Sequence, residues 1–239
     1  MENTLYYTTE KPGNFVRPIS IENTAVLVVD MQNEFVLTNY GDAKRFKAEN
    51  MYQQWEPYYN RLWHKVVPTI QKLLAYFRNK DTVITYARIA CFRSDGTDRS
   101  PVQRRPGWNN ILLPRSGYGA QIISELSPKE NEIVIEKTND SVANGTGYVQ
   151  ILRNLNITTV VVSGIVTDQC VATSVRDLAD LGFNVIVIED ACAAATKEAH
   201  DAELKIMNHI YCEVMNSQDV QKLYHSLELS RSVNHLNQK

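Results

Sequence analysis

Short runs of β-branched and aliphatic residues alternate with amphipathic stretches along this chain, and this alternation limits the possible folds more than any other feature. Six of the runs are expected to form strands, at residues 24–30, 82–87, 132–136, 158–163, 184–190 and 210–215. Most are continuously apolar, which is typical of strands covered on both faces in a parallel sheet. Helical patterns lie between them, at about 59–78, 119–126, 146–155, 170–181, 197–209 and 217–227. We therefore predict an α/β fold, a three-layer α/β/α Rossmann-like sandwich with a mainly parallel six-stranded sheet.

The length and composition of the chain agree with a single globular domain. With 239 residues, the chain can bury a substantial core. Apolar residues make up 44% of it and charged residues 22%, which argues against disordered and fibrous proteins. We expect one domain over residues 1–239, with its core at about 22–229 and polar termini.

Charge and the N-terminal residues bear on partners and location. The 25 basic and 27 acidic residues give a net charge of −2, which offers no electrostatic case for nucleic acid or an anionic membrane as a partner. No apolar run approaches the roughly 18–20 residues of a transmembrane helix. The first residues, MENTLYYTTEKPGNF, lack the apolar stretch of a secretory signal. We predict a cytoplasmic protein that binds neither nucleic acid nor membranes.

Three polar residues lie at or just after the carboxyl ends of different predicted strands. Asp30 ends the first strand, Lys137 follows the third, and Cys170 follows the fourth and begins the next helical pattern. The carboxyl ends of parallel strands meet at one edge of the sheet, where ligands bind. Singly, each residue has an ordinary explanation: a turn cap, a solvated ammonium and a small buried thiol. Together they bring a base, a cation and a nucleophile to one crevice.

Cys170 has the chemistry of a nucleophile in this setting. A helix N-terminus lowers the pKa of a thiol, and a nearby lysine lowers it further. A carboxylate such as Asp30 can accept the thiol proton. Backbone N–H groups at the same helix end can hold an oxyanion when the thiolate attacks a carbonyl. The other cysteines, Cys91, Cys192 and Cys212, are far apart in the sequence, and we expect them to be ordinary buried thiols.

Two long segments, 36–57 and 88–115, leave the carboxyl ends of the first two strands, and we expect binding loops there. The second segment holds six arginines. One or two of them can bind a substrate carboxylate, or the run forms a solvated loop paired with Asp95 and Asp98. The six are Arg88, Arg93, Arg99, Arg104, Arg105 and Arg115.

Three sequence blocks together resemble one known superfamily. They are VLVVDMQNEF, EKTNDSVANGT and SGIVTDQCVATSVRDLADLGFNVIVIEDACAA, in this order. They are similar to the isochorismatase-like cysteine hydrolases, which include nicotinamidase, N-carbamoylsarcosine amidase, biuret hydrolase, ureidoacrylate amidohydrolase and streptothricin hydrolase. The resemblance covers about residues 24–217, and the block around Cys170 is its most specific part. It implies the isochorismatase-like hydrolase fold.

The resemblance also implies roles for individual residues. By position, Asp30 matches the general base, Lys137 the catalytic lysine and Cys170 the nucleophile. A cis peptide would join Ile165 and Val166, so that the N–H groups of Val166 and Cys170 form the oxyanion hole. Residues at or near the substrate would be Gln32, Phe35, Ala143, Asn144 and Thr167.

The chain departs from the superfamily pattern in two places. Metal-dependent nicotinamidases carry an Asp-x-His element after the second strand, whereas this chain reads TYARIACFRSDGTDRS there. We therefore expect no catalytic metal and no cofactor. Relatives without a metal often have an aromatic residue where this chain has Ala143, which predicts a roomier pocket unless a neighbouring aromatic fills the space. Candidates for that are Tyr40, Tyr86 and Trp108.

These observations predict a metal-independent cysteine amidohydrolase. Its substrate would be a small linear amide, carbamoyl or ureido compound, cleaved through a thioester on Cys170. One alternative is an isochorismatase-type hydrolase of a vinyl ether, which does not need a thiol nucleophile. Another is a catalytically silent small-molecule binding protein on the same fold. The resemblance also implies a homo-oligomer.

Overall fold

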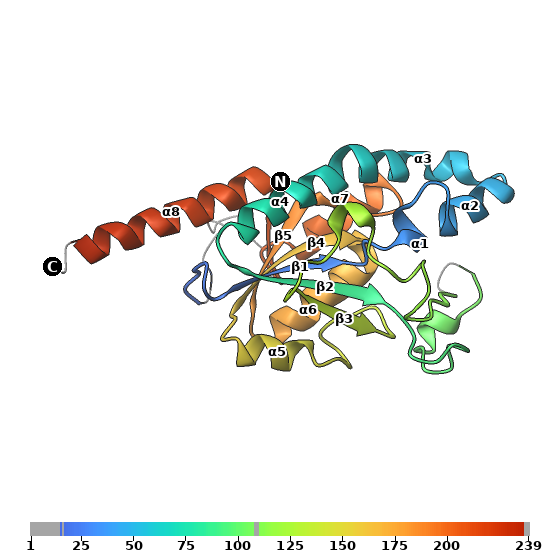
Figure 1. The fold of residues 1–239 in the computed structure, drawn as a ribbon. Coiled ribbons are helices and arrows are strands. Elements are labelled where there is room, and N and C mark those ends of the chain that lie inside the picture. Colours follow the sequence, from blue (N-terminus) through green and yellow to red (C-terminus); the bar gives the residue numbers. More distant parts are fainter. Residues whose placement is uncertain (1–14, 16, 108–109, 237–239) are drawn as a thin grey trace.

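A six-stranded parallel sheet forms the centre of the molecule (Figure 1). The computed structural model describes residues 15, 17–107 and 110–236. The strands follow the order β3-β2-β1-β4-β5-β6, and every neighbouring pair is parallel. They span β1 Thr24–Val29, β2 Val83–Ile89, β3 Ile133–Lys137, β4 Thr159–Ile165, β5 Asn184–Ala193 and β6 Glu213–Met215. The predicted three-layer sandwich with a parallel six-stranded sheet is confirmed.

Helices cover both faces of this sheet (Figure 1). α3, α4 and α8 contribute to the apolar core on one face, whereas α5, α6 and α7 pack on the other. One π-helical turn, Leu62–Val66, joins α3 to α4. Another, Thr167–Val171, leads into α6. The α-helices are α1 Asn33–Val36, α2 Gly41–Ala48, α3 Tyr52–Arg61, α4 Val67–Arg78, α5 Tyr148–Asn154, α6 Ala172–Asp180, α7 Lys197–Met207 and α8 Ser217–Leu236.

The two central strands explain where a site forms. Every residue of β1 and of β4 is buried, as expected for apolar runs covered by helices on both faces. The chain runs outward from β1 to β2 and β3, then returns to place β4 on the other side of β1. Ligands bind where the strand order reverses in this way, at the carboxyl ends of the strands. Here that point lies between β1 and β4.

The segment 36–57, predicted as a loop, is largely helical. It contains α2 and the first part of α3, so the helix predicted from residue 59 begins at Tyr52 and continues to the end of α4. Two prolines lie within this stretch: Pro57 inside α3, and Pro68 directly after the first residue of α4. Proline lacks the N–H for a regular helical bond. The π-helical turn ends at Val66, two residues before Pro68, and the Val67 N–H donates to the carbonyl of Leu62.

Two other predicted elements are wrong or too long. The helix predicted at 119–126 is reduced to a 3₁₀ turn, Ser124–Leu126, because its backbone bonds elsewhere. The carbonyls of Gly119 and Gln121 accept from the first N–H groups of α1, and the Ile123 N–H donates to Met31. The last predicted strand shortens to β6, because residues 210–212 form the turn after α7. A 3₁₀ helix, Val102–Arg104, occurs within the predicted loop 88–115. Among the described residues, no helix is long and apolar enough to cross a membrane.

Candidate active site

Asp30, Lys137 and Cys170 come together at the carboxyl ends of the central strands, as predicted. Asp30 directly follows β1 with φ of +52°, and its N–H donates to the carbonyl of Ala87. Lys137 ends β3, and its side chain reaches past the end of the intervening β2 to Asp30. Cys170 lies in the π-helical turn between β4 and α6. Lys137 Nζ is 2.8 Å from Asp30 Oδ2 and 3.4 Å from Cys170 Sγ.

The ammonium of Lys137 is held by three groups of the protein. Besides Asp30 and Cys170, it donates to the carbonyl of Asn139 at 3.2 Å. The Lys137 side chain is 0% exposed and the Asp30 side chain 3%. An ammonium has three N–H donors, and each has a partner here. Lys137 is therefore fixed between the carboxylate and the thiol and has no contact with solvent.

The pKa of Cys170 differs from the sequence-based expectation. Burial raises the pKa of this thiol well above its usual range, and the charge of Asp30 adds to the effect, while Lys137 opposes it. Burial also raises the pKa of Asp30 against the opposing charge of Lys137. Burial works against the ammonium of Lys137, but the charges of Asp30 and Cys170 raise its pKa overall. The predicted low pKa of the thiol is wrong, because burial outweighs the lysine and the helix end. The raised pKa favours the neutral thiol in the resting site.

The turn before Cys170 has an unusual backbone. The peptide bond between Ile165 and Val166 is cis, at the position that the resemblance implies. The carbonyl of Val166 accepts hydrogen bonds from the N–H groups of Gln169 and Val171, on either side of Cys170. Val166 and Cys170 both line the pocket described next. The oxyanion hole assigned to their N–H groups stays a prediction.

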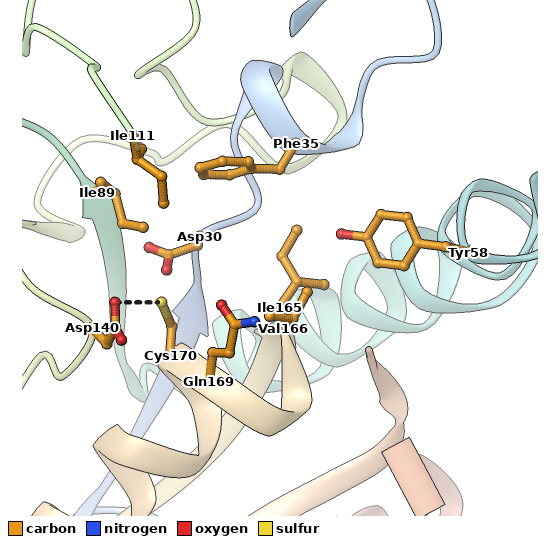
Figure 2. A pocket seen from close by; sticks show the side chains of 10 residues that line it. All are labelled: Asp30, Phe35, Tyr58, Ile89, Ile111, Asp140, Ile165, Val166, Gln169 and Cys170. Carbon is orange, nitrogen blue, oxygen red and sulfur yellow. Dashed lines mark hydrogen bonds between the residues drawn. The ribbon is translucent and has the colours of Figure 1, made fainter. Parts of the chain in front are cut away.

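A narrow pocket opens over the thiol (Figure 2). Its cavity has a volume of about 30 Å³. Aliphatic and aromatic side chains form most of the wall, while the polar atoms gather around Cys170 (Figure 2). The lining consists of Asp30, Phe35, Tyr58, Ile89, Ile111, Asp140, Ile165, Val166, Gln169 and Cys170.

Comparison with known proteins places this chain in a family. Residues 24–219 match the Isochorismatase domain. The chain belongs to the isochorismatase family. A ureidoacrylate amidohydrolase of Acinetobacter baylyi is 28% identical over 227 residues, which cover 88% of each chain.

Solved structures agree with this assignment. A cysteine hydrolase from Pseudomonas syringae pv. phaseolicola has a TM-score of 0.73 and 25% identity, over 88% of this chain and 96% of that one. N-carbamoylsarcosine amidase from Thermoplasma acidophilum has a TM-score of 0.63 and 26% identity, over 82% of this chain and 96% of that one. This chain is an isochorismatase-family hydrolase.

Several pocket residues of this isochorismatase-family chain were missed from the sequence. Tyr58 lies on α3, and Asp140 lies in the loop after Lys137. Ile89, Ile111 and Gln169 complete the set. Asp140 and Gln169 stand three residues after Lys137 and one before Cys170, so their closeness in sequence to the predicted triad was a usable signal. Ile89 and Ile111 lie in segment 88–115, which was predicted to hold a binding loop but without naming these residues, and Tyr58 offered no signal, because long-range packing brings it to the pocket.

Of the predicted substrate-binding residues, Phe35 lines the pocket but Gln32 and Thr167 do not. The Gln32 amide accepts from the Ile89 N–H and donates to the carbonyls of Ile89 and Ala120. It is fully buried and joins the end of β1 to that of β2. The Thr167 hydroxyl bonds Nδ1 of His200 at 2.8 Å. Both side chains are used to hold the backbone around the site.

Ala143 and Asn144 also lie outside the lining of the pocket. Ala143 is buried in the core beneath α5 and α6, and Asn144 is exposed. The missing aromatic at Ala143 therefore does not widen the site. Of the aromatics considered for that space, Tyr40 contacts Tyr118, Tyr86 contacts Arg78 and Glu132, and Trp108 lies outside the described residues. Phe35 and Tyr58 supply the aromatic wall instead.

The arginines of segment 88–115 are absent from the described lining of the pocket. Arg93 pairs with Asp95, as the solvated-loop alternative predicts. Arg88 and Arg115 instead pair with Glu136, which that alternative did not name. Arg99 donates to backbone carbonyls and to the side chain of Asn110, and Arg104 and Arg105 are exposed.

The other three cysteines lie outside the lining of the pocket. Cys91, Cys192 and Cys212 are buried and free, which confirms the expectation for these thiols. Within the described ranges, no three His, Cys, Asp or Glu side chains are grouped as metal ligands. The expectation of metal-independent chemistry stays a prediction.

Proposed function

We propose that this isochorismatase-family hydrolase is a cysteine amidohydrolase that cleaves the C–N bond of a small linear amide, carbamoyl or ureido substrate. One observation carries the proposal: a buried ammonium, Lys137, contacts both a carboxylate and a thiol at the floor of a narrow pocket. This arrangement holds one negative charge that either Asp30 or Cys170 can carry. A neutral thiol beside such a carboxylate becomes a nucleophile when its proton moves to the carboxylate.

The first half of the reaction forms the thioester. Asp30 Oδ2 is bound to Lys137, whereas Oδ1 has no hydrogen-bond partner among the described residues and can accept the thiol proton. The thiolate attacks the substrate carbonyl, and the N–H groups of Val166 and Cys170 hold the oxyanion. When the tetrahedral intermediate collapses, the C–N bond breaks and Asp30 gives its proton to the leaving amine. The ammonium of Lys137 stays paired with whichever group is anionic.

The second half reverses these roles. Asp30, again a carboxylate, takes a proton from water, and the resulting hydroxide attacks the thioester carbonyl. The C–S bond breaks, and the Cys170 thiolate recovers a proton from Asp30. One water is consumed, and the acid and the amine are released. The chain's own residues supply each proton acceptor and donor in this sequence.

The relatives support the reaction class. The names of the Acinetobacter and Thermoplasma proteins denote hydrolysis of a ureido and a carbamoyl compound, and the Pseudomonas protein is a cysteine hydrolase. The small volume of the pocket favours a compact scissile group of the same kind.

The test is ammonia release from a panel of small amides by the wild-type chain and by Cys170→Ala. The panel holds nicotinamide, biuret, N-carbamoyl amino acids, ureidoacrylate and maleamate, each with and without a chelator. Release that needs Cys170 and resists the chelator supports the proposal. Release that persists in Cys170→Ala, or hydrolysis of a vinyl ether that survives thiol alkylation, contradicts it.

A further inference from the structure

A second carboxylate faces the pocket beside the nucleophile. Asp140 Oδ1 lies 3.9 Å from Cys170 Sγ, and Figure 2 shows Asp140 on the opposite side of the sulfur from Gln169. The Gln103 amide contacts the same oxygen at 3.4 Å. Asp140 is only partly buried, in contrast to Asp30. The mechanism above gives Asp140 no role, yet a substrate at Cys170 must lie against it.

No positive charge in the pocket balances this carboxylate for an incoming ligand. Of the described residues that line the pocket, none is basic. Lys137 is beneath the floor, with all three of its N–H donors occupied and no exposure. Arg45 lines two neighbouring hollows instead, and its guanidinium already pairs with Asp42. A substrate carboxylate near Cys170 would meet Asp140 without a compensating cation.

We propose that Asp140 determines the charge of the substrate: the pocket accepts amides whose groups next to the scissile carbonyl are neutral or cationic N–H donors, and rejects carboxylate-bearing amides. This inference rests on the proposed amidohydrolase function. A carboxylate accepts hydrogen bonds from amide, urea or ammonium N–H groups and repels another carboxylate. In the panel above, biuret fits this class and nicotinamide is neutral but has no N–H donor beyond its scissile amide, whereas ureidoacrylate, maleamate and N-carbamoyl amino acids carry a carboxylate and do not fit.

The size of the effect follows from the separation of the charges. A small substrate carboxylate bound over Cys170 would lie within about 6 Å of Asp140, where like charges near a protein surface disfavour binding by about 100-fold. Exposure of Asp140 reduces this, so we expect discrimination of at least about 10-fold.

Alkylation of Cys170 tests the charge preference without requiring turnover. Iodoacetamide and iodoacetate differ only in an amide against a carboxylate, and both transfer their carbon to the thiolate with loss of iodide. Peptide mass spectrometry gives the rate of alkylation of Cys170 by each reagent. The rate with iodoacetamide is divided by the rate with iodoacetate, and this ratio is then divided by the same ratio for glutathione. We expect this quotient to be at least about 10 in the wild type and to fall to within about 3-fold of unity in Asp140→Asn. Asp201→Asn, which removes an exposed carboxylate on α7, is the matched control and should keep the wild-type quotient.

Two results of the alkylation experiment would overturn the inference. One is a wild-type quotient near unity. The other is an equally high quotient in Asp140→Asn, which would assign the repulsion to Asp30. Asp140→Ser replaces Asp140→Asn if the latter loses its far-UV circular dichroism, and the same criteria apply to it.

Hydrolysis of a matched substrate pair separates this inference from the proposed function. Succinamide and succinamate carry the same scissile amide, and only succinamate carries a carboxylate. Preferential cleavage of succinamide, with a preference that shrinks in Asp140→Asn, supports both proposals. Equal cleavage of the two compounds overturns the role of Asp140 and leaves the amidohydrolase standing. If no amide in either set is cleaved while Asp140 still controls alkylation, the proposed function fails and the charge selection by the pocket stands.

Discussion

Replacing Lys137 with methionine is the sharpest test of how the site works. The ammonium lies 2.8 Å from Asp30 Oδ2 and 3.4 Å from Cys170 Sγ. At an effective dielectric constant of about 20, these distances correspond to attractions of about 6 and about 5 kcal/mol. Because the two values are nearly equal, the negative charge passes from Asp30 to Cys170 at an electrostatic cost of only about 1 kcal/mol from the lysine. In the proposed mechanism, Lys137 thus stabilises both ends of the proton transfer.

Without the ammonium, the thiolate would lose about 5 kcal/mol of stabilisation in a buried site. We expect kcat/KM of Lys137→Met to fall by about three orders of magnitude, measured as amide hydrolysis. Alkylation of Cys170 by iodoacetamide should slow in parallel. Lys222→Met, which removes an exposed ammonium on α8, is the control and should keep the wild-type rate. A Lys137→Met protein that keeps its wild-type thermal stability and a kcat/KM within about 10-fold of the wild type would refute this account.

The same variant carries a stability signature. Removing one partner of a buried ion pair costs about 3–5 kcal/mol when it leaves the other charge uncompensated. The pKa of Asp30 is already raised by burial, so the folded state binds its proton more tightly than the unfolded chain does. Stability from such a group is present at low pH and is lost as pH rises through the folded-state pKa. The urea midpoint of Lys137→Met should therefore approach the wild-type value as pH falls from about 8 to about 5.

Three further changes probe single contacts. Asp30→Asn should lower kcat/KM by about three orders of magnitude. The double variant Asp30→Asn/Lys137→Met should have a kcat/KM only slightly lower than either single variant, and additive losses in a rate assay would show that the two residues act independently. Tyr58 is 4% exposed, and its hydroxyl points toward the pocket from α3 (Figure 2), so Tyr58→Phe should lower kcat/KM by about 10-fold, while alkylation of Cys170 by iodoacetamide stays unchanged. Burial and the charge of Arg61 lower the pKa of His200 to about 4, so the unfolded chain binds a proton at this residue more readily than the folded protein does. The free energy of unfolding should therefore decrease as pH falls from about 6.5 to about 4, and denaturant titrations should show a smaller decrease in His200→Gln.

The contact behind the last prediction also shows how the turn with the nucleophile is held. Arg61 can only donate, so Nε2 of His200 must accept at 2.9 Å, and the Nδ1–H then donates to Thr167 at 2.8 Å. Arg61 lies on α3 and His200 on α7, so two helices fix the residue that follows the cis peptide. The resemblance placed Thr167 at or near the substrate. Its hydroxyl instead serves this bridge.

The triad was predictable because it depends on chain order and strand direction. Asp30, Lys137 and Cys170 each follow a run of apolar residues, and parallel strands bring such positions to one edge. The pKa of Cys170 was not predictable in the same way. A helix end and a lysine lower the pKa of a thiol, but the extent of burial decides whether desolvation exceeds them, and burial is a property of the packed molecule.

Helix boundaries failed where distant segments compete for the backbone. Residues 119–126 carry a helical pattern, yet their carbonyls bond the start of α1, a contact between parts of the chain more than 80 residues apart. Local periodicity contains no information on such pairing. The π-helical turn before Pro68 is different, because proline itself signals a defect in the helix.

By itself, the sequence determined the parallel sheet, the order of its motifs and the three residues of the triad, since hydrophobic periodicity and strand ends are local properties. Only the tertiary structure decided what surrounds the thiol. It placed Tyr58 and Asp140 on the pocket, withdrew Gln32, Ala143, Asn144 and Thr167 from it, and left a carboxylate beside the thiol with no basic side chain among the described residues of the lining. The physical reason is that solvation and charge at a site depend on which distant side chains pack around it, and that packing is settled only when the whole chain has folded.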